Sequence, residues 1–186
     1  DETCRQLAEW DLLMGPGAPA RANVNVSALQ LDDNLPAQVA AALDRHGLPA
    51  ARISIEITES ALMKDPDSAR TVLQQLRDLG VELAIDDFGT GYSSLAYLRH
   101  LPVDCLKVDR SFVAELGEGH GEIASAVIAL ARNLKLCTVA EGVETSAQAA
   151  ELRRLGATYL QGFSLAEPMS GGRAAAWFAT NGDSAR

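Results

Sequence analysis

Cysteine is scarce in this sequence. The three cysteines (Cys4, Cys105 and Cys137) are widely spaced and form no CxxC pair. Their odd number and spacing argue against a zinc knuckle and against a disulfide framework. We therefore expect three reduced, buried thiols in a cytoplasmic protein.

Long apolar runs are also missing. The most apolar stretches, such as residues 123–131, are shorter than the roughly 20 residues that span a bilayer. The first residues contain no basic segment leading into an apolar run, so no secretory signal is expected. These absences predict a chain without a membrane span and a cytoplasmic location.

Positive charge is in the minority. The chain has 16 Lys and Arg against 25 Asp and Glu, a formal net charge of -9. This balance argues against DNA or RNA as a partner, because their backbones attract basic surfaces. An acidic protein can still bind a phosphodiester if divalent cations offset the repulsion. The alternative is that the charge only keeps the surface soluble.

Short apolar strands alternate with amphipathic helices along the chain. We expect strands at 21–27, 53–59, 81–87, 105–109, 136–142 and 159–163. We expect helices at 4–13, 36–46, 67–79, 122–134, 145–155 and 172–179, with a short one ending at residue 100 and Asp67 as a candidate N-cap. This alternation predicts parallel βαβ units in an α/β fold. One domain over residues 1–180 and a frayed tail at 181–186 are expected.

Polar side chains stand near the end of each of these strands. They are Asn25, Glu56, Asp86 with Asp87, Lys107, Glu141 and Gln161. A barrel gathers all its strand C-termini around one mouth, whereas an open sheet concentrates ligand groups at one switch point. The distribution therefore favours a TIM-like (β/α) barrel.

Carboxylate and amide oxygens dominate this set. Such ligands suit Mg, Mn or Ca, and the absence of histidine and cysteine makes a zinc site improbable. The three histidines (His46, His100 and His120) are expected at loops and helix ends without a role. A carboxylate shared by two cations is the arrangement that activates water in phosphodiester hydrolysis.

Asp86 and Asp87 would point to opposite faces of a regular strand. Both can reach one site only where the strand ends and the backbone turns; alternatively, Asp87 caps the following loop. Lys107 lies within an apolar strand, where it could hold a water, stabilise a transition-state oxygen, form a Schiff base or extend to solvent. Glu59 could hold a neighbouring loop or open a helix.

Five segments together resemble the EAL phosphodiesterases, in order and at suitable spacing. They are NVNVSALQL, ISIEITESALMKD, AIDDFGTGYSSLAYLRHLPVDCLKVDRSFV, TVAEGVET and LGATYLQGFSLAEPM. The resemblance covers the chain from Cys4 to about Met169. It implies a TIM-like barrel that holds two divalent cations, Mg or Mn, and hydrolyses cyclic di-GMP to linear pGpG.

The resemblance also implies roles for individual residues. The implied metal ligands are Asn25, Glu56, Asp86, Asp87 and Glu141, and the implied catalytic residues are Lys107, Glu141 and Gln161. Glu59 would anchor the loop at 87–94, and Glu144 would support the site from behind. That loop and the following helix are the expected homodimer interface. A GGDEF or sensor domain is an expected partner in a longer protein, and the substrate-binding residues remain unassigned.

One feature of the family has no counterpart here. The Glu-Ala-Leu strand and the strand before it are absent, and with them a metal-binding glutamate and a phosphate-contacting arginine. Six of the eight barrel strands are expected. The protein could be longer, pair with a chain that fills the gap, or be a decayed domain.

Three functions therefore compete. The first is a metal-dependent cyclic di-GMP phosphodiesterase. The second is a non-catalytic cyclic di-GMP sensor or interaction domain. The third, judged without the family, is a lyase or aldolase that uses Lys107 as a Schiff base, although the surrounding carboxylates would keep its amine protonated.

Overall fold

The computed structural model describes residues 1–91, 95–116 and 120–181. Six parallel strands follow one another in the sheet in the order of the sequence. They are β1 (Ala22–Val26), β2 (Ile53–Thr58), β3 (Glu82–Phe88), β4 (Cys105–Val108), β5 (Cys137–Ala140) and β6 (Tyr159–Leu160). All six expected strands are present, and each overlaps its expected range.

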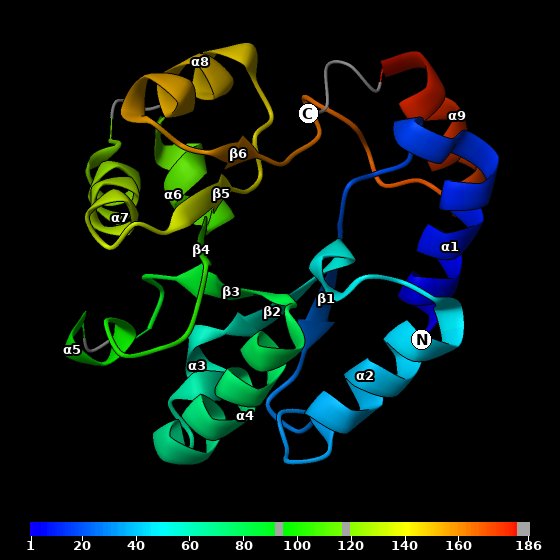
Figure 1. The fold of residues 1–186 in the computed structure, drawn as a ribbon. Helices are drawn as coiled ribbons and strands as arrows, with labels where there is room; N and C mark the ends of the chain where they lie inside the picture. Colours follow the sequence, from blue (N-terminus) through cyan, green and yellow to red (C-terminus); the bar gives the residue numbers. More distant parts are fainter. Residues whose placement is uncertain (92–94, 117–119, 182–186) are drawn as a thin grey trace.

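Helices connect and cover these strands (Figure 1). The longer ones are α1 (Glu2–Met14), α2 (Leu35–His46), α4 (Pro66–Leu79), α7 (Glu122–Asn133), α8 (Ser146–Leu155) and α9 (Gly171–Asn181). The short ones are α3 (Glu59–Leu62), α5 (Leu95–Leu98), α6 (Arg110–Glu115) and the 3-10 turns η1 (Gly15–Gly17) and η2 (Ala50–Arg52). The expected tail lies, from residue 182 on, outside the described residues.

Sequence periodicity missed the short helices α3 and α6 because each has too few residues to show a repeat. Both begin where a strand ends and are capped by a side chain. Thr58 accepts a hydrogen bond from the Ala61 amide at 3.3 Å, and Asp109 accepts one from the Ser111 amide at 2.9 Å. The expected cap of α4 was two residues late: Asp65, not Asp67, caps the helix, because Pro66 occupies the first helical position.

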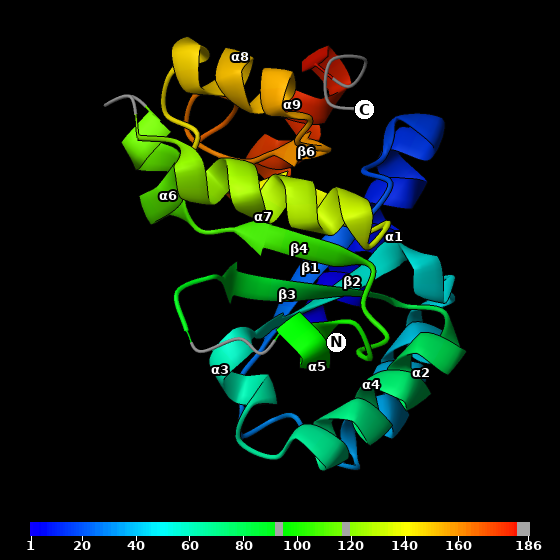
Figure 2. The same cartoon turned by 90° about the vertical axis from the view of Figure 1, so that its left-hand side faces the viewer.

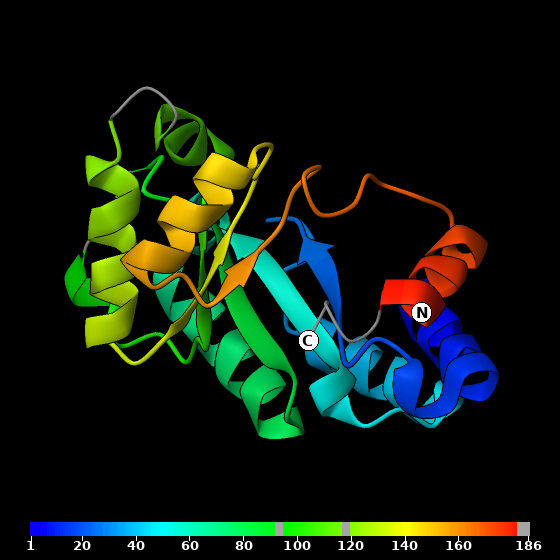
Figure 3. The same ribbon diagram turned by 90° about the horizontal axis from the view of Figure 1, so that it is seen from above.

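The sheet curls but does not close. Seen from above, it bends from β1 round to β6, and the chain after β6 crosses to α9, which lies beside α1 (Figure 3). Strand β1 pairs only with β2, and β6 only with β5, among the described residues. The incomplete TIM-like barrel expected from the sequence is therefore confirmed.

The two faces of the sheet differ in chemistry. Ile53, Ile55 and Ile57 of β2 are buried against the helical layer, which includes α4 below β2 and β3 in Figure 2. The alternate residues Ser54 and Glu56 face the inside of the curl, because successive side chains of a strand point to opposite faces. The inner face of β2 is therefore polar, and the main apolar core lies between the sheet and its helices.

The contacts between α1 and α9 bring the two ends of the chain together. The Trp10 indole nitrogen donates a hydrogen bond to the Gly171 carbonyl at 3.2 Å, and its ring packs edge-on against Phe178, with centroids 6.1 Å apart. Trp177 packs against the same phenylalanine. Both tryptophans thus pack in the contact between the two terminal helices.

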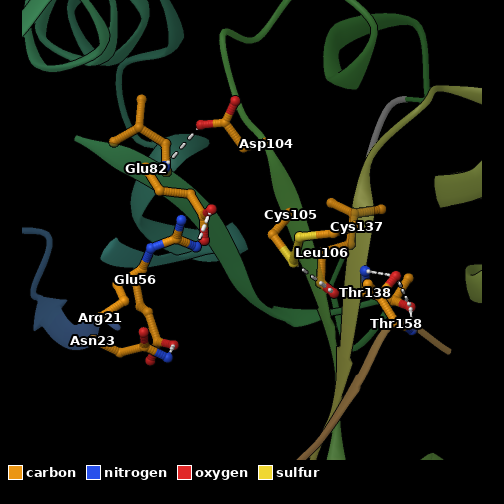
Figure 4. The surroundings of a disulfide bond; sticks show 11 residues. Arg21, Asn23, Glu56, Glu82, Asp104, Cys105, Leu106, Cys137, Thr138 and Thr158 are labelled. Atoms are coloured by element: carbon orange, nitrogen blue, oxygen red, sulfur yellow. Dashed lines mark hydrogen bonds and ion pairs between the residues drawn. A yellow bond between two sulfur atoms is a disulfide. The ribbon is translucent and has the colours of Figure 1, made fainter. Parts of the chain in front are cut away.

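The expectation of three reduced thiols was wrong for two of them. Cys105 and Cys137 are joined by a disulfide, while Cys4 is free and buried (Figure 4). The two cysteines are 32 residues apart in sequence but lie opposite each other in the register of β4 and β5, with a Cα–Cα distance of 4.5 Å. Sequence spacing could not reveal this pairing because the strand register creates it.

No helix in the part of the chain that the structure describes is long and apolar enough to cross a membrane. Disulfides are uncommon in cytosolic proteins. The cytoplasmic location therefore stays a prediction.

Candidate active site

Lys107 on β4 lies at the centre of a buried ionic cluster. Its Nζ is 2.6 Å from Glu56 Oε2, 2.6 Å from Glu141 Oε1 and 3.1 Å from Asp86 Oδ1. Lys107 is only 3% exposed and Glu56 only 4%. Strands β2, β3 and β4 and the residue after β5 each supply one member, because parallel strands bring their carboxyl ends to the same rim. Four residues expected at a site are therefore in direct contact.

The charges of this cluster do not balance. Three carboxylates surround one ammonium group, and burial makes their mutual repulsion costly. Burial lowers the pKa of Lys107, but hydrogen bonds to Glu141 and Glu56 outweigh it, and the net pKa is raised. Burial raises the pKa of Glu141, against the opposing effect of Lys107. The raised pKa keeps Lys107 protonated, and a metal cation would offset the repulsion among the carboxylates around it.

Asp86 and Asp87 both reach this site. The backbone of Asp87 adopts a φ of 53°, in the left-handed region, and the register between β3 and β4 is irregular between Ile85 and Phe88. This local irregularity turns the second carboxylate to the side of the first, so the turn expected at the strand end lies within β3. Among the described residues, no loop amide donates to the Asp87 carboxyl; the Asp87 carbonyl accepts hydrogen bonds from Thr90 instead.

Asp86, Asp87 and Glu141 form a set that could hold a metal ion. Each offers a carboxylate oxygen, and these oxygens all lie within 4.8 Å of one another. The side chains are half-buried, and burial together with the charge of Asp86 raises the pKa of Asp87. The donor set consists of hard oxygens, which fits Mg or Mn and not a sulphur-seeking metal.

Glu59 lies under the loop that follows β3. It is 5% exposed, and its Oε2 accepts a hydrogen bond from the Gly89 amide at 3.1 Å. A Cβ added to Gly91 would come within 2.7 Å of Glu59 Oε1, so the loop backbone passes close to this carboxylate. Glu59 is also the first residue of α3. The two alternatives considered for it therefore both apply; residues 92–94 of the loop lie outside the described part.

Within the described ranges, no hydrogen bond or ion pair joins Lys107 to the remaining expected residues. Asn25 pairs with Glu56 in the register of β1 and β2, and its exposed side chain makes no hydrogen bond within the described residues. Gln161 is exposed, and its backbone bonds to Ala140 and Val143. Glu144 is exposed and has no ion pair to the cluster among the described residues. Their proposed roles stay predictions.

A cavity of about 840 Å³ runs along the inner face of the sheet. It extends from Arg52 and Glu82 near the strand starts to Glu56 and Gln161. Sequence reasoning assigned no role to several polar residues in its wall, among them Asn23, which donates a hydrogen bond to Glu56. The available signal was the alternation of β1, which puts Asn23 on the same face as Asn25.

Comparisons with known proteins agree with this geometry. The model of the EAL domain family matches residues 1–168. The bifunctional diguanylate cyclase/cyclic di-GMP phosphodiesterase MucR of Pseudomonas aeruginosa is 49% identical over 172 residues, which are 91% of this chain and 25% of that protein. The cyclic di-GMP phosphodiesterase NbdA of the same organism is 51% identical over 134 residues, 71% of this chain and 17% of that protein.

Solved structures show the same fold. The PaMucR phosphodiesterase in complex with c-di-GMP superimposes with a TM-score of 0.87 at 46% identity, over 93% of this chain and 70% of that one. The EAL domain of Mycobacterium smegmatis DcpA gives a TM-score of 0.89 at 43% identity, over 96% of this chain and 81% of that one. The chain spans about a quarter or less of the length of MucR and NbdA. On the family match and on these identities, the chain belongs to the EAL domain family.

Proposed function

We propose that this chain takes part in metal-dependent hydrolysis of cyclic di-GMP to linear pGpG. The observation that supports this most directly is the buried lysine ringed by Glu56, Asp86 and Glu141 at the carboxyl ends of parallel strands. The relatives MucR and NbdA, whose names include cyclic di-GMP phosphodiesterase, support the same substrate.

In this proposal the acidic residues bind two divalent cations, Mg or Mn. Asn25, Glu56, Asp86, Asp87 and Glu141 are the proposed ligands. When bound, the cations would activate water and neutralise charge on the phosphodiester.

The other proposed residues position the attacking water or support the loop and the site. Lys107, which is protonated, would turn a donor from one of its three carboxylate partners to the attacking water or a phosphate oxygen. Gln161 lies in the wall of the cavity that Glu56 also lines, where it would orient the water, and Glu141 would accept the proton of that water. Glu59 anchors the loop at 87–94, and Glu144 supports the site from behind.

The test is turnover of cyclic di-GMP with Mg²⁺ or Mn²⁺. We would compare this chain with a form extended at its N-terminus, and include Glu56→Ala in the extended form. Formation of pGpG by the extended form only, lost in Glu56→Ala, would support the proposal and assign the missing strands to the metal site. Absence of metal-dependent turnover in both forms would refute hydrolysis.

A non-catalytic cyclic di-GMP sensor is the second candidate. The PaMucR structure, which is a complex with c-di-GMP, supports binding of this ligand. Calorimetric binding of cyclic di-GMP without any pGpG formation, in both forms, would establish the sensor function instead.

The Schiff-base alternative conflicts with the ionic cluster. An amine must lose its proton to attack a carbonyl, and the raised pKa of Lys107 keeps that proton in place. We expect no covalent product after borohydride treatment with carbonyl substrates. A stable adduct on Lys107 in the mass spectrum would revive this alternative.

Partners follow from the same proposal. We propose a homodimer through the loop at 87–94 and helix α5, and a GGDEF or sensor domain in a longer protein; the name of MucR includes a diguanylate cyclase. A cytoplasmic location fits such an arrangement. Light scattering of the extended form, with and without cyclic di-GMP, tests the dimer.

A further inference from the structure

We propose that Asn23 is a positioning residue for the metal site: it fixes the Glu56 carboxylate in the orientation that binds a cation. This inference rests on the proposed metal-dependent function. It concerns a residue two positions before the expected ligand Asn25, on the same inner face of β1.

The contact is short and specific. Asn23 Nδ2 donates a hydrogen bond to Glu56 Oε1 at 2.7 Å, and Figure 4 shows the two side chains meeting between β1 and β2. A carboxylate can only accept, so the amide must turn its nitrogen, not its oxygen, toward Glu56. In the strand register Asn23 lies opposite Ser54, and its side chain therefore reaches along the sheet to Glu56.

Glu56 is held from two sides. Asn23 binds Oε1, and Lys107 binds Oε2 at 2.6 Å. Two donors restrict rotation of the carboxylate, which is 4% exposed. A carboxylate offers about four lone-pair sites, so the remaining ones stay available to a cation. The Glu56 carboxylate is thus held in one orientation and keeps acceptor capacity for a cation.

The choice of donor has an electrostatic consequence. Lys107 already contributes one positive charge, and a second cationic donor would repel an incoming metal ion. The neutral amide of Asn23 orients the carboxylate without adding charge. Loss of a donor that orients a metal ligand commonly lowers the affinity for the metal about 10-fold to 100-fold.

The experiment is Mn²⁺ titration calorimetry without substrate, in the N-terminally extended protein used for turnover. Wild type is compared with Asn23→Ala, Asn23→Leu and the control Asn133→Ala, an exposed asparagine at the end of α7. We expect Asn23→Ala to weaken Mn²⁺ binding by about 10-fold or more, while Asn133→Ala binds as wild type does. The KM for cyclic di-GMP should stay unchanged, and the Mn²⁺ concentration for half-maximal turnover should rise.

Asn23→Leu separates orientation from packing. It is of similar size but has no donor and adds no charge beside Glu56, so it should lose affinity as Asn23→Ala does. Wild-type affinity in either Asn23 variant would overturn the positioning role, even if wild type turns over. No Mn²⁺ binding by wild type would instead overturn the proposed function itself and this inference with it. Circular dichroism confirms that the compared variants are folded.

Discussion

Asp86 and Asp87 are adjacent in the sequence, yet both place a carboxylate oxygen within 4.8 Å of a Glu141 oxygen. The cause is the left-handed backbone of Asp87, with a φ of 53°, inside the irregular end of β3. Asparagine and aspartate tolerate this conformation better than other non-glycine residues, and β-branched residues tolerate it poorly.

Substitution of Asp87 tests this geometry. We expect Asp87→Asn to keep the free energy of unfolding near that of wild type, because Asn accepts the same backbone and removes a carboxylate whose pKa is raised by burial. Asp87→Val should cost about 1–3 kcal/mol through backbone strain. Urea denaturation measures both. Equal stability of the two variants would show that the conformation is not a constraint.

Lys107 should be important for stability as well as for activity. Replacing it with Met leaves the buried Glu56 and its partners without their cation, which costs about 3–5 kcal/mol in comparable buried pairs. Thermal unfolding measures the loss, and added Mn²⁺ should recover part of it by supplying the missing positive charge. Lys64→Met, at an exposed lysine, is the matched control. A Lys107→Met protein as stable as this control would contradict the ionic cluster.

The acidic set predicts how pH and metal interact. Burial raises the pKa values of Asp87 and Glu141 in the metal-free protein. These groups therefore favour the folded state at low pH, below the pKa values they have in the unfolded chain. That contribution is lost as pH rises through their pKa values in the folded protein. A cation favours the ionised form, so Mn²⁺ should raise Tm more at about pH 8 than at about pH 5. A larger metal effect at the lower pH would be inconsistent with carboxylate ligands.

The Cys105–Cys137 disulfide predicts a defined thiol count. Alkylation of the denatured protein without reductant should modify only Cys4, and all three cysteines should react after reduction. Reduction should lower the free energy of unfolding by about 2–4 kcal/mol, the usual effect of a native disulfide. The double variant Cys105→Ser, Cys137→Ser should lose its sensitivity to reductant. Three reactive thiols before reduction would show that the pair is not bonded.

Gly162 should be intolerant of a side chain. A Cβ there would overlap the backbone nitrogen and oxygen of Val143, so Gly162→Ala must displace the segment that carries Gln161. We expect a cost of about 1–3 kcal/mol from overpacking, with reduced turnover. Gly172→Ala, where a Cβ meets nothing within 4 Å, is the control. Equal unfolding midpoints for Gly162→Ala and Gly172→Ala would disprove the close approach of Gly162 to Val143.

Local patterns in the sequence were sufficient to predict the α/β architecture. The alternation of β-branched strands such as Ile53–Thr58 with amphipathic helices such as α4 needs only side-chain periodicity, which is a property of neighbouring residues. The polar residues at the strand ends followed from the same pattern. Parallel strands must bring those ends to one rim, so a shared site for Glu56, Asp86, Lys107 and Glu141 could be predicted.

The contacts between these residues, and the bonding of the cysteines, depend on the tertiary structure. The bulge that turns Asp87, the Asn23–Glu56 hydrogen bond and the Cys105–Cys137 disulfide all depend on the register or irregularity of neighbouring strands. Strand register depends on packing across the sheet. It brings together residues 32 positions apart in the disulfide and 33 positions apart in the Asn23–Glu56 hydrogen bond. Local sequence patterns predicted the fold class and the polar residues at the rim of the sheet. Only the folded sheet determined the contacts, because they join residues that no local pattern relates.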